Sequence, residues 1–204
     1  MIKAILCDTE GVLLTGETER FSAKYAREKG FDVAELDDFF KNYFPLTLVG
    51  KAQLDDVMWQ HRQAWHLASK DEMDALLQVW RADNGGIIAE NVAAINNAKH
   101  NGIFCCASTN QEIGRGEYFY NTVLPSGLFD AIYISAAVGA KKPSKEYFHF
   151  VVNDLAEKGV INDPGELLFV DDDQENIDGA NEVGIVATLY DRAENLSEIL
   201  RRLA

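Results

Sequence analysis

The stretch Ile5-Leu6-Cys7-Asp8-Thr9-Glu10-Gly11-Val12-Leu13 decides the fold of this chain. Apolar residues run without a break up to Asp8, which is the pattern of a buried strand that ends in a polar turn. In an open parallel sheet the carboxyl ends of the strands share one edge, and ligands bind at that edge. We therefore expect Asp8 and Glu10 to lie at a ligand-binding edge of a parallel sheet.

Three further polar signals follow in order along the chain. They are Ser108-Thr109-Asn110 after an apolar run, then Lys141-Lys142-Pro143, and finally Asp171-Asp172-Asp173 after a second apolar run. At a shared sheet edge, carboxylates from two strands would meet a hydroxyl from a third strand and a nearby lysine. Clustered carboxylates repel one another unless a cation lies among them, and ligands that are all oxygen suit a hard ion such as Mg²⁺.

The chain from residue 84 onward predicts alternating helices and strands. After a first strand at 3–7, the expected helices are 89–100, 112–122, 144–157, 174–183 and 194–203, and the expected strands are 103–107, 131–134, 167–170 and 185–188. This alternation predicts an α/β fold, in which a parallel sheet is covered by helices on both faces.

Residues 17–81 contain no convincing strand and predict four helices. The first covers Phe21 to Ala26 and ends near Gly30, and the second runs from Val33 and ends before Pro45. The third runs from Leu54 to Ala68. The fourth has Ser69 as its N-cap, with Glu72 at the capping-box position, and extends to Trp80. Asp83-Asn84-Gly85-Gly86 is a breaker and a predicted domain junction. We therefore expect a core of residues 1–14 and 84–204, with residues 15–83 forming a helical cap over the strand edge.

Composition limits the classes of function. The 204 residues are 47% hydrophobic and 25% charged, as in ordinary globular proteins, and they can bury one sizeable core plus an insert. The net charge of -14 argues against nucleic acid or an anionic membrane surface as a partner. No apolar run approaches the length of a membrane span, which is roughly 18 residues, and the N-terminus does not have the pattern of a signal peptide.

The three cysteines, Cys7, Cys105 and Cys106, all fall in predicted strands. An odd number of buried cysteines indicates free thiols, and we expect a cytoplasmic protein. Because side chains alternate along a strand, Cys7 should point away from the face of Asp8, as a buried structural thiol rather than a nucleophile.

In the order and spacing of its four motifs, from residue 8 to residue 176, the chain resembles hydrolases of the haloacid dehalogenase (HAD) superfamily, of the phosphatase kind. The stretches at 124–135 and 176–185 are also similar to that family. Within it, the chain most resembles the small sugar-phosphate phosphatases with a short helical cap. The resemblance implies a Rossmann-like core with a cap inserted after the first strand, and a Mg²⁺-dependent phosphatase acting on a small phosphorylated metabolite, as a monomer or weak dimer.

The resemblance also implies roles for the acidic residues. Asp8 would be the nucleophile that forms an aspartyl-phosphate. Asp8, the backbone carbonyl of Glu10, and Asp172 would bind the metal ion, with Asp172 placed as a direct ligand by its register with Asn176. Asp171 would act less directly, through water or by holding a lysine.

The remaining motifs would bind the phosphoryl group. Thr109 would hydrogen-bond a transferring phosphoryl oxygen, with Ser108 as the alternative if the register differs by one residue. Asn110 would orient the phosphoryl group or the nucleophile, and Lys142 would neutralise the phosphoryl oxygens and keep Asp8 ionised.

Glu10 departs from the pattern of the family, which more often has a second Asp at this position. As general acid and base it would protonate the leaving oxygen and then activate water, on a side chain one methylene longer. Two alternatives remain open: a phosphomutase, which would share all of these residues, and a binding or regulatory relative whose catalysis is impaired by Glu10.

The predicted cap supplies candidates for substrate contact. Arg20 begins the cap near the site, and one of the three tryptophans, Trp59, Trp65 and Trp80, or Phe44 could face the substrate. His61 lies on an apolar helix stripe and is interpreted as part of the cap core.

Overall fold

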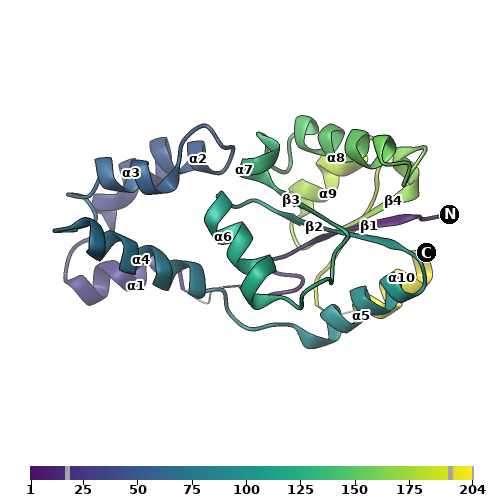
Figure 1. Cartoon of the computed structure of the whole chain (residues 1–204), viewed down its shortest axis with the longest axis horizontal. Helices are drawn as coiled ribbons and strands as arrows, with labels where there is room; N and C mark the ends of the chain where they lie inside the picture. Colours follow the sequence, from purple (N-terminus) through teal and green to yellow (C-terminus); the bar gives the residue numbers. More distant parts are fainter. Residues whose placement is uncertain (17–18, 193–194, 204) are drawn as a thin grey trace.

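The centre of the protein is a five-stranded parallel sheet with the strand order β3-β2-β1-β4-β5 (Figure 1). A computed structural model describes residues 1–16, 19–192 and 195–203 of the chain. The strands are β1 (Ala4–Asp8), β2 (Phe104–Thr109), β3 (Ala131–Ile134), β4 (Leu167–Asp171) and β5 (Val186–Leu189). The predicted α/β class is therefore confirmed, and each strand lies within two residues of its predicted position.

Helices cover both faces of the sheet (Figure 1). One face carries α5 (Ala89–His100) and α10 (Leu196–Leu203), and the other carries α8 (Lys145–Glu157) and α9 (Gln174–Asn181). The shorter elements are α6 (Ile113–Tyr118), the π-helical η3 (Phe119–Val123), α7 (Ser135–Val138) and the 3₁₀ helix η4 (Pro164–Glu166). Residue 194, the predicted start of the last helix, lies outside the described residues.

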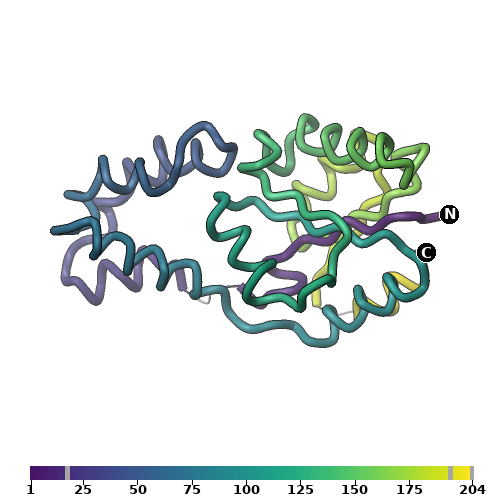
Figure 2. The backbone as a smooth tube through the Cα atoms, in the orientation of Figure 1, coloured from purple at the N-terminus to yellow at the C-terminus, as the bar shows by residue number. Residues whose placement is uncertain are grey.

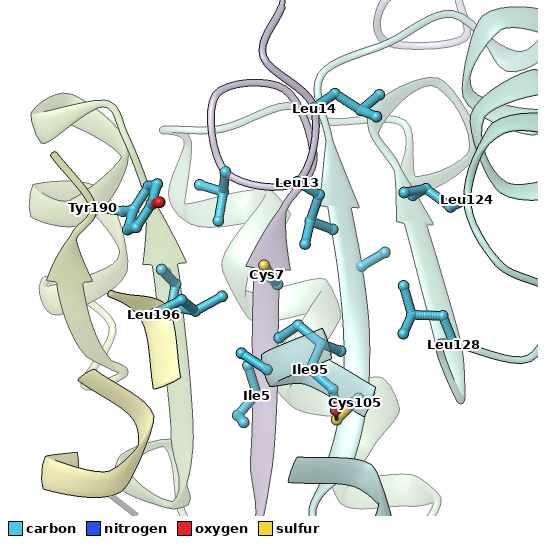
Figure 3. Packing of buried hydrophobic residues seen from close by; sticks show 14 of the residues in the cluster. Ile5, Cys7, Leu13, Leu14, Ile95, Cys105, Leu124, Leu128, Tyr190 and Leu196 are labelled. Carbon is cyan, nitrogen blue, oxygen red and sulfur yellow. Dashed lines mark hydrogen bonds between the residues drawn. The ribbon is translucent and has the colours of Figure 1, made fainter. Parts of the chain in front are cut away.

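Strand β1 divides its side chains between two hydrophobic clusters, one on each face of the sheet. Ile5 and Cys7 pack into the cluster on the α5 side, which Figure 3 shows from close by. Ala4 and Leu6 pack into the cluster on the α8 side. The alternation expected of a strand thus places Cys7 in the core, where burial raises the pKa of its thiol. All three cysteines are buried and free, as predicted.

The helices between residues 21 and 82 pack around a third hydrophobic cluster of their own. They are α1 (Phe21–Lys29), the 3₁₀ helix η1 (Val33–Leu36), the π-helical η2 (Phe39–Tyr43), α2 (Phe44–Thr47), α3 (Leu54–Gln60) and α4 (Lys70–Ala82). Figures 1 and 2 show this group set apart from the sheet, on the side toward which β1 runs from the N-terminus. We call these helices the cap. None of the described helices combines the length and apolarity that a membrane crossing requires.

Two of the predicted cap helices differ from the structure. The second does not end before Pro45: helical turns continue without a break over residues 33–47, changing from η1 through η2 to α2, and Pro45 lies in the first turn of α2. The third ends at Gln60, so the apolar spacing that continued to Trp65 belongs to turns. The predicted N-cap Ser69 is confirmed, since its hydroxyl accepts a hydrogen bond from the Glu72 N–H at 3.2 Å.

Two chain segments that lie side by side join the cap to the rest of the molecule. The Thr15 N–H donates to the Gly86 carbonyl at 2.8 Å, and Leu14 pairs with Ile87 in an antiparallel bridge. Beneath them, the buried Asn91 amide donates to the Val12 carbonyl at 2.6 Å and to the Tyr190 hydroxyl at 2.8 Å. Asn91 therefore fixes the loop that follows β1.

We predict that Asn91→Ala lowers the free energy of unfolding by about 1–3 kcal/mol, because it leaves a buried carbonyl and a hydroxyl without their donor. Urea unfolding followed by circular dichroism measures the change. The control is Asn96→Ala on the exposed side of the same helix, which should stay within about 0.5 kcal/mol of wild type. Equal stability of the two variants would contradict this account of the loop.

Candidate active site

A buried lysine lies between two aspartates at the carboxyl edge of the sheet. The Lys142 Nζ donates to Asp8 Oδ1 at 2.5 Å and to Asp171 Oδ2 at 2.6 Å. Asp8 ends β1, Asp171 ends the neighbouring β4, and Lys142 comes from the segment between α7 and α8. Lys142 is 2% exposed and Asp171 is fully buried, so these ion pairs are shielded from water.

Burial sets the electrostatics of this cluster. Loss of solvation raises the pKa of Asp8 to about 7, although Lys142 acts in the opposite direction. For Lys142, burial lowers the pKa, but Asp8 and Asp171 outweigh it and hold the value above its ordinary range. Lys142 is therefore a permanent cation, and Asp8 is a carboxylate whose ionised form depends on positive charge nearby.

Both oxygens of Asp171 already accept hydrogen bonds from the protein. Oδ2 accepts from Lys142, while Oδ1 accepts from the Asp173 N–H at 2.9 Å and from the Asn176 amide at 3.0 Å. These contacts orient the carboxylate toward Lys142. Asp171 is thus built to position the lysine.

Asp172 has a different environment, with its carboxylate against Gly11 of the loop after β1. A Cβ added to Gly11 would lie 1.9 Å from Asp172 Oδ2, and Gly11 has φ +90°. Burial, followed by the charge of Asp171, raises the pKa of Asp172. Glycine at position 11 therefore makes room for this carboxylate beside β1.

The three aspartates form the kind of cluster that can hold a cation. Each of Asp8, Asp171 and Asp172 offers a carboxylate oxygen within 4.8 Å of the others. Lys142 balances only one of the three negative charges if all three are ionised. Because the Asp171 oxygens are engaged, Asp8 and Asp172 are the side chains that fit a hard divalent ion such as Mg²⁺.

The residues that end β2 divide between the core and the site. Ser108 is the register partner of Asp8, and its hydroxyl pairs with the Tyr147 hydroxyl at 2.7 Å. The Thr109 hydroxyl has no hydrogen-bond partner among the described residues. Of the two hydroxyls considered from the sequence, that of Thr109 is the one left available to a ligand.

Asn110 contacts the backbone of the lysine segment. Its amide donates to the Lys142 carbonyl at 2.9 Å and accepts from the Lys142 N–H at 2.9 Å. The side chain that the sequence assigned to the phosphoryl group or the nucleophile is therefore engaged in fixing Lys142 against the end of β2.

Glu10 is turned toward a second cluster. Its carboxylate accepts hydrogen bonds from the Gln111 amide at 2.5 Å and from Arg115 Nη2 at 3.2 Å. Arg115 also donates to the Asp83 carbonyl at 2.9 Å, and its guanidinium lies over the ring of Trp80 at 4.8 Å. Glu10 is thus linked through one arginine to the last turn of α4 and the end of the cap.

The structure brings Asp8, Lys142, Asp171 and Asp172 into one cluster and places Thr109 and Asn110 at its border, whereas the Glu10 carboxylate is held elsewhere. Sequence reasoning missed the partners of Glu10, Gln111 and Arg115. Their position in the sequence could have indicated this role. Both residues closely follow the end of β2, where the chain leaves the carboxyl edge of the sheet and begins its next helix.

The family of haloacid dehalogenase-like hydrolases matches residues 2–184, and the chain belongs to it. No curated protein matches the chain.

Several solved structures share the fold. A HAD family enzyme of Bacteroides thetaiotaomicron, solved with magnesium and inorganic phosphate, has a TM-score of 0.80 at 21% identity, with 98% of this chain and 100% of that chain covered. A HAD-like family hydrolase of Porphyromonas gingivalis has a TM-score of 0.75 at 23% identity, covering 100% and 98%. A HAD phosphatase of Thermococcus onnurineus has a TM-score of 0.63 at 20% identity, covering 94% and 87%. At these identities the similarity establishes the fold alone.

We predict that Gly11→Ala weakens Mg²⁺ binding at least tenfold, because the new methyl group would displace the Asp172 carboxylate. Calorimetric titration with Mg²⁺ measures the affinity. Gly16→Ala is the matched control, since Gly16 also has positive φ, at +74°, but a Cβ there would meet no described atom within 4 Å. Both variants carry backbone strain, and only the first should lose the ion; equal losses would contradict the placement of Asp172.

Proposed function

We propose that the protein is a Mg²⁺-dependent phosphatase that hydrolyses small phosphate monoesters through an aspartyl-phosphate on Asp8. The observation that carries the proposal is the buried Lys142 between Asp8 and Asp171, with Asp172 beside them. Family membership supports a hydrolase, and the magnesium and phosphate bound to the Bacteroides enzyme are consistent with this chemistry.

The first step transfers the phosphoryl group to the enzyme. A carboxylate oxygen of Asp8 attacks phosphorus, the bond between phosphorus and the ester oxygen breaks, and the leaving alcohol takes up one proton. Lys142 binds Asp8 Oδ1, so we assign the attack to Oδ2. A fixed ammonium group at this distance also stabilises negative charge on the equatorial phosphoryl oxygens.

The second step returns the enzyme to its starting state. A water molecule gives up one proton and attacks phosphorus of the aspartyl-phosphate, the bond from phosphorus to Asp8 breaks, and inorganic phosphate leaves. The Thr109 hydroxyl, which ends β2 beside the aspartates, would donate a hydrogen bond to a phosphoryl oxygen in both steps. Asn110 acts indirectly, because it holds the backbone of Lys142.

Asp8, Asp172 and the Glu10 carbonyl would hold the Mg²⁺, with Asp171 positioned behind Lys142. When bound, the ion would supply positive charge to the phosphoryl oxygens and to Asp8. That charge would favour the ionised, nucleophilic form of Asp8, whose pKa burial raises to about 7.

Glu10 is proposed as general acid and base, with Arg115 and Gln111 as positioning residues. In the described arrangement its carboxylate faces these two partners. Because Arg115 also contacts Asp83 and Trp80 at the end of the cap, movement of the cap would move the partner of Glu10. A cap that closes over the site would also exclude water from the reaction.

We predict that Asp8→Asn reduces phosphate release to background, because an amide cannot form the acyl-phosphate. The measurement is inorganic phosphate released from a panel of phosphate monoesters, with and without Mg²⁺. Asp163→Asn serves as control, since it changes an exposed aspartate before β4, at the opposite edge of the sheet. Activity of Asp8→Asn within tenfold of wild type would overturn the nucleophile.

We predict that Glu10→Gln lowers turnover by roughly 100-fold or more for alkyl esters, the usual scale for general acid–base catalysis. The loss should be smaller for nitrophenyl phosphate, because its leaving group needs little protonation. Glu90→Gln, at an exposed position in the first turn of α5, is the control. Unchanged turnover of alkyl esters by Glu10→Gln would exclude Glu10 as the acid.

The same assays test the alternatives. A wild-type chain inactive on the whole panel, with activity gained in Glu10→Asp, would support a binding or regulatory relative. An isomerised product in place of free phosphate would indicate a phosphomutase.

A further inference from the structure

A cavity of about 580 Å³ lies between the cap and the carboxyl edge of the sheet. Most of its wall comes from apolar cap side chains, among them Phe40, Phe44 and Trp80. The core contributes Asn110, Gln111 and Arg115. Its volume lies in the range of cavities that bind small organic molecules.

The cavity adjoins the candidate active site through residues that contact both. Gln111 and Arg115, which line it, also hold the carboxylate of Glu10, and Asn110 holds the backbone of Lys142. A phosphoryl group placed at Asp8 would therefore direct the rest of its ester toward this cavity.

The wall favours an apolar ligand. The three core side chains already hydrogen-bond within the protein, and the charged cap residues at the wall, Arg20 and Asp37, are exposed. A polyhydroxylated sugar would lose hydrogen bonds to water here and find few replacements. Alkyl and aromatic groups would instead bury their surface against phenylalanine and tryptophan rings.

One buried donor in the wall also lacks a partner. The indole N–H of Trp65, a cavity-lining residue that is 4% exposed, makes no hydrogen bond to the described residues. Buried donors are rarely left in this state. The indole nitrogen has almost no accessible surface, so Trp65 lines the cavity with other atoms of its side chain.

We propose that this cavity receives the alcohol part of the substrate, and that the substrates are phosphate monoesters of apolar alkyl or aromatic alcohols rather than sugar phosphates. The inference rests on the proposed phosphatase function, and it specifies the substrate class for that same site.

The test is kcat/KM with Mg²⁺ for ethyl, propyl, butyl, pentyl and hexyl phosphate, with glucose 6-phosphate for comparison. All are esters of primary alcohols, so the chemistry of the leaving group stays nearly constant. If each added methylene is buried, kcat/KM should rise about fourfold per methylene, which is about 60-fold from propyl to hexyl phosphate. A flat or falling series, or glucose 6-phosphate exceeding hexyl phosphate, would overturn the substrate class while leaving the phosphatase function intact.

If no ester is hydrolysed, measuring the binding of the esters tests the apolar cavity separately from the phosphatase function. Calorimetry with Mg²⁺ would then compare hexyl and propyl phosphate as ligands. Tighter binding of hexyl phosphate by the same factor supports the apolar cavity although the phosphatase proposal has failed, and equal binding overturns the cavity proposal as well.

Phe40→Ser and Phe150→Ser form a matched pair of variants. Phe40 lines the cavity and is 37% exposed, and Phe150 is a 45% exposed phenylalanine of α8 that does not line it. Phe40→Ser should lower kcat/KM about tenfold for hexyl phosphate and less than twofold for ethyl phosphate, whereas Phe150→Ser should change neither. Equal effects of Phe40→Ser on both esters would contradict the proposal, and the wild-type series decides the question if this variant does not fold.

Discussion

The contact of one buried lysine with two buried aspartates determines how the rest of this site is arranged. Charges removed from water are costly, and they are tolerated only where their partners are fixed at hydrogen-bond distance. Lys142 meets that condition with Asp8 and Asp171, which end adjacent parallel strands. Removing the lysine would leave two buried aspartates without their cation, and removing either aspartate would leave the lysine with a single anionic partner. The arrangement therefore requires the strand order of this sheet, the orientation of Asp171 by Asn176, and the attachment of the lysine segment by Asn110.

Much of this architecture could be predicted from local sequence. The strands are short apolar runs that end in polar residues, and the sharing of one edge by parallel strands then brings Asp8, Thr109 and Asp171 together. Ser69 was predictable as an N-cap because its partner lies three residues away in sequence. These features depend on neighbours along the chain or on a general rule of sheet geometry, so a single sequence contains them.

Other features depend on tertiary contacts, which the spacing of apolar residues along the sequence does not reveal. The apolar spacing from Leu54 to Trp65 suits one helix, but the chain turns after Gln60, and Trp65 reaches the cap core from a turn. The orientation of Glu10 is a second case. Its position in the motif was clear, but its partners Gln111 and Arg115 lie about a hundred residues away, so the direction of its side chain could be known only from the fold. The cavity beneath the cap is a third, since its wall combines residues from the cap and from the chain after β2.

In the proposed reaction, the charged carboxyl edge of the sheet and the apolar wall of the cap recognise different parts of the substrate. A phosphoryl group presents the same charge whatever alcohol it is attached to. Under the proposed function, the cluster of Asp8, Lys142 and Asp172 would therefore recognise phosphate esters as a class but would not distinguish one alcohol from another. Discrimination among alcohols must come from surfaces beyond phosphorus, and here those surfaces belong mainly to the cap. Arg115 touches both regions, because it pairs with Glu10 and stacks on Trp80 of the cavity wall. Occupation of the cavity would therefore act on the residue that holds the proposed general acid, which couples recognition of the alcohol to the step that protonates it.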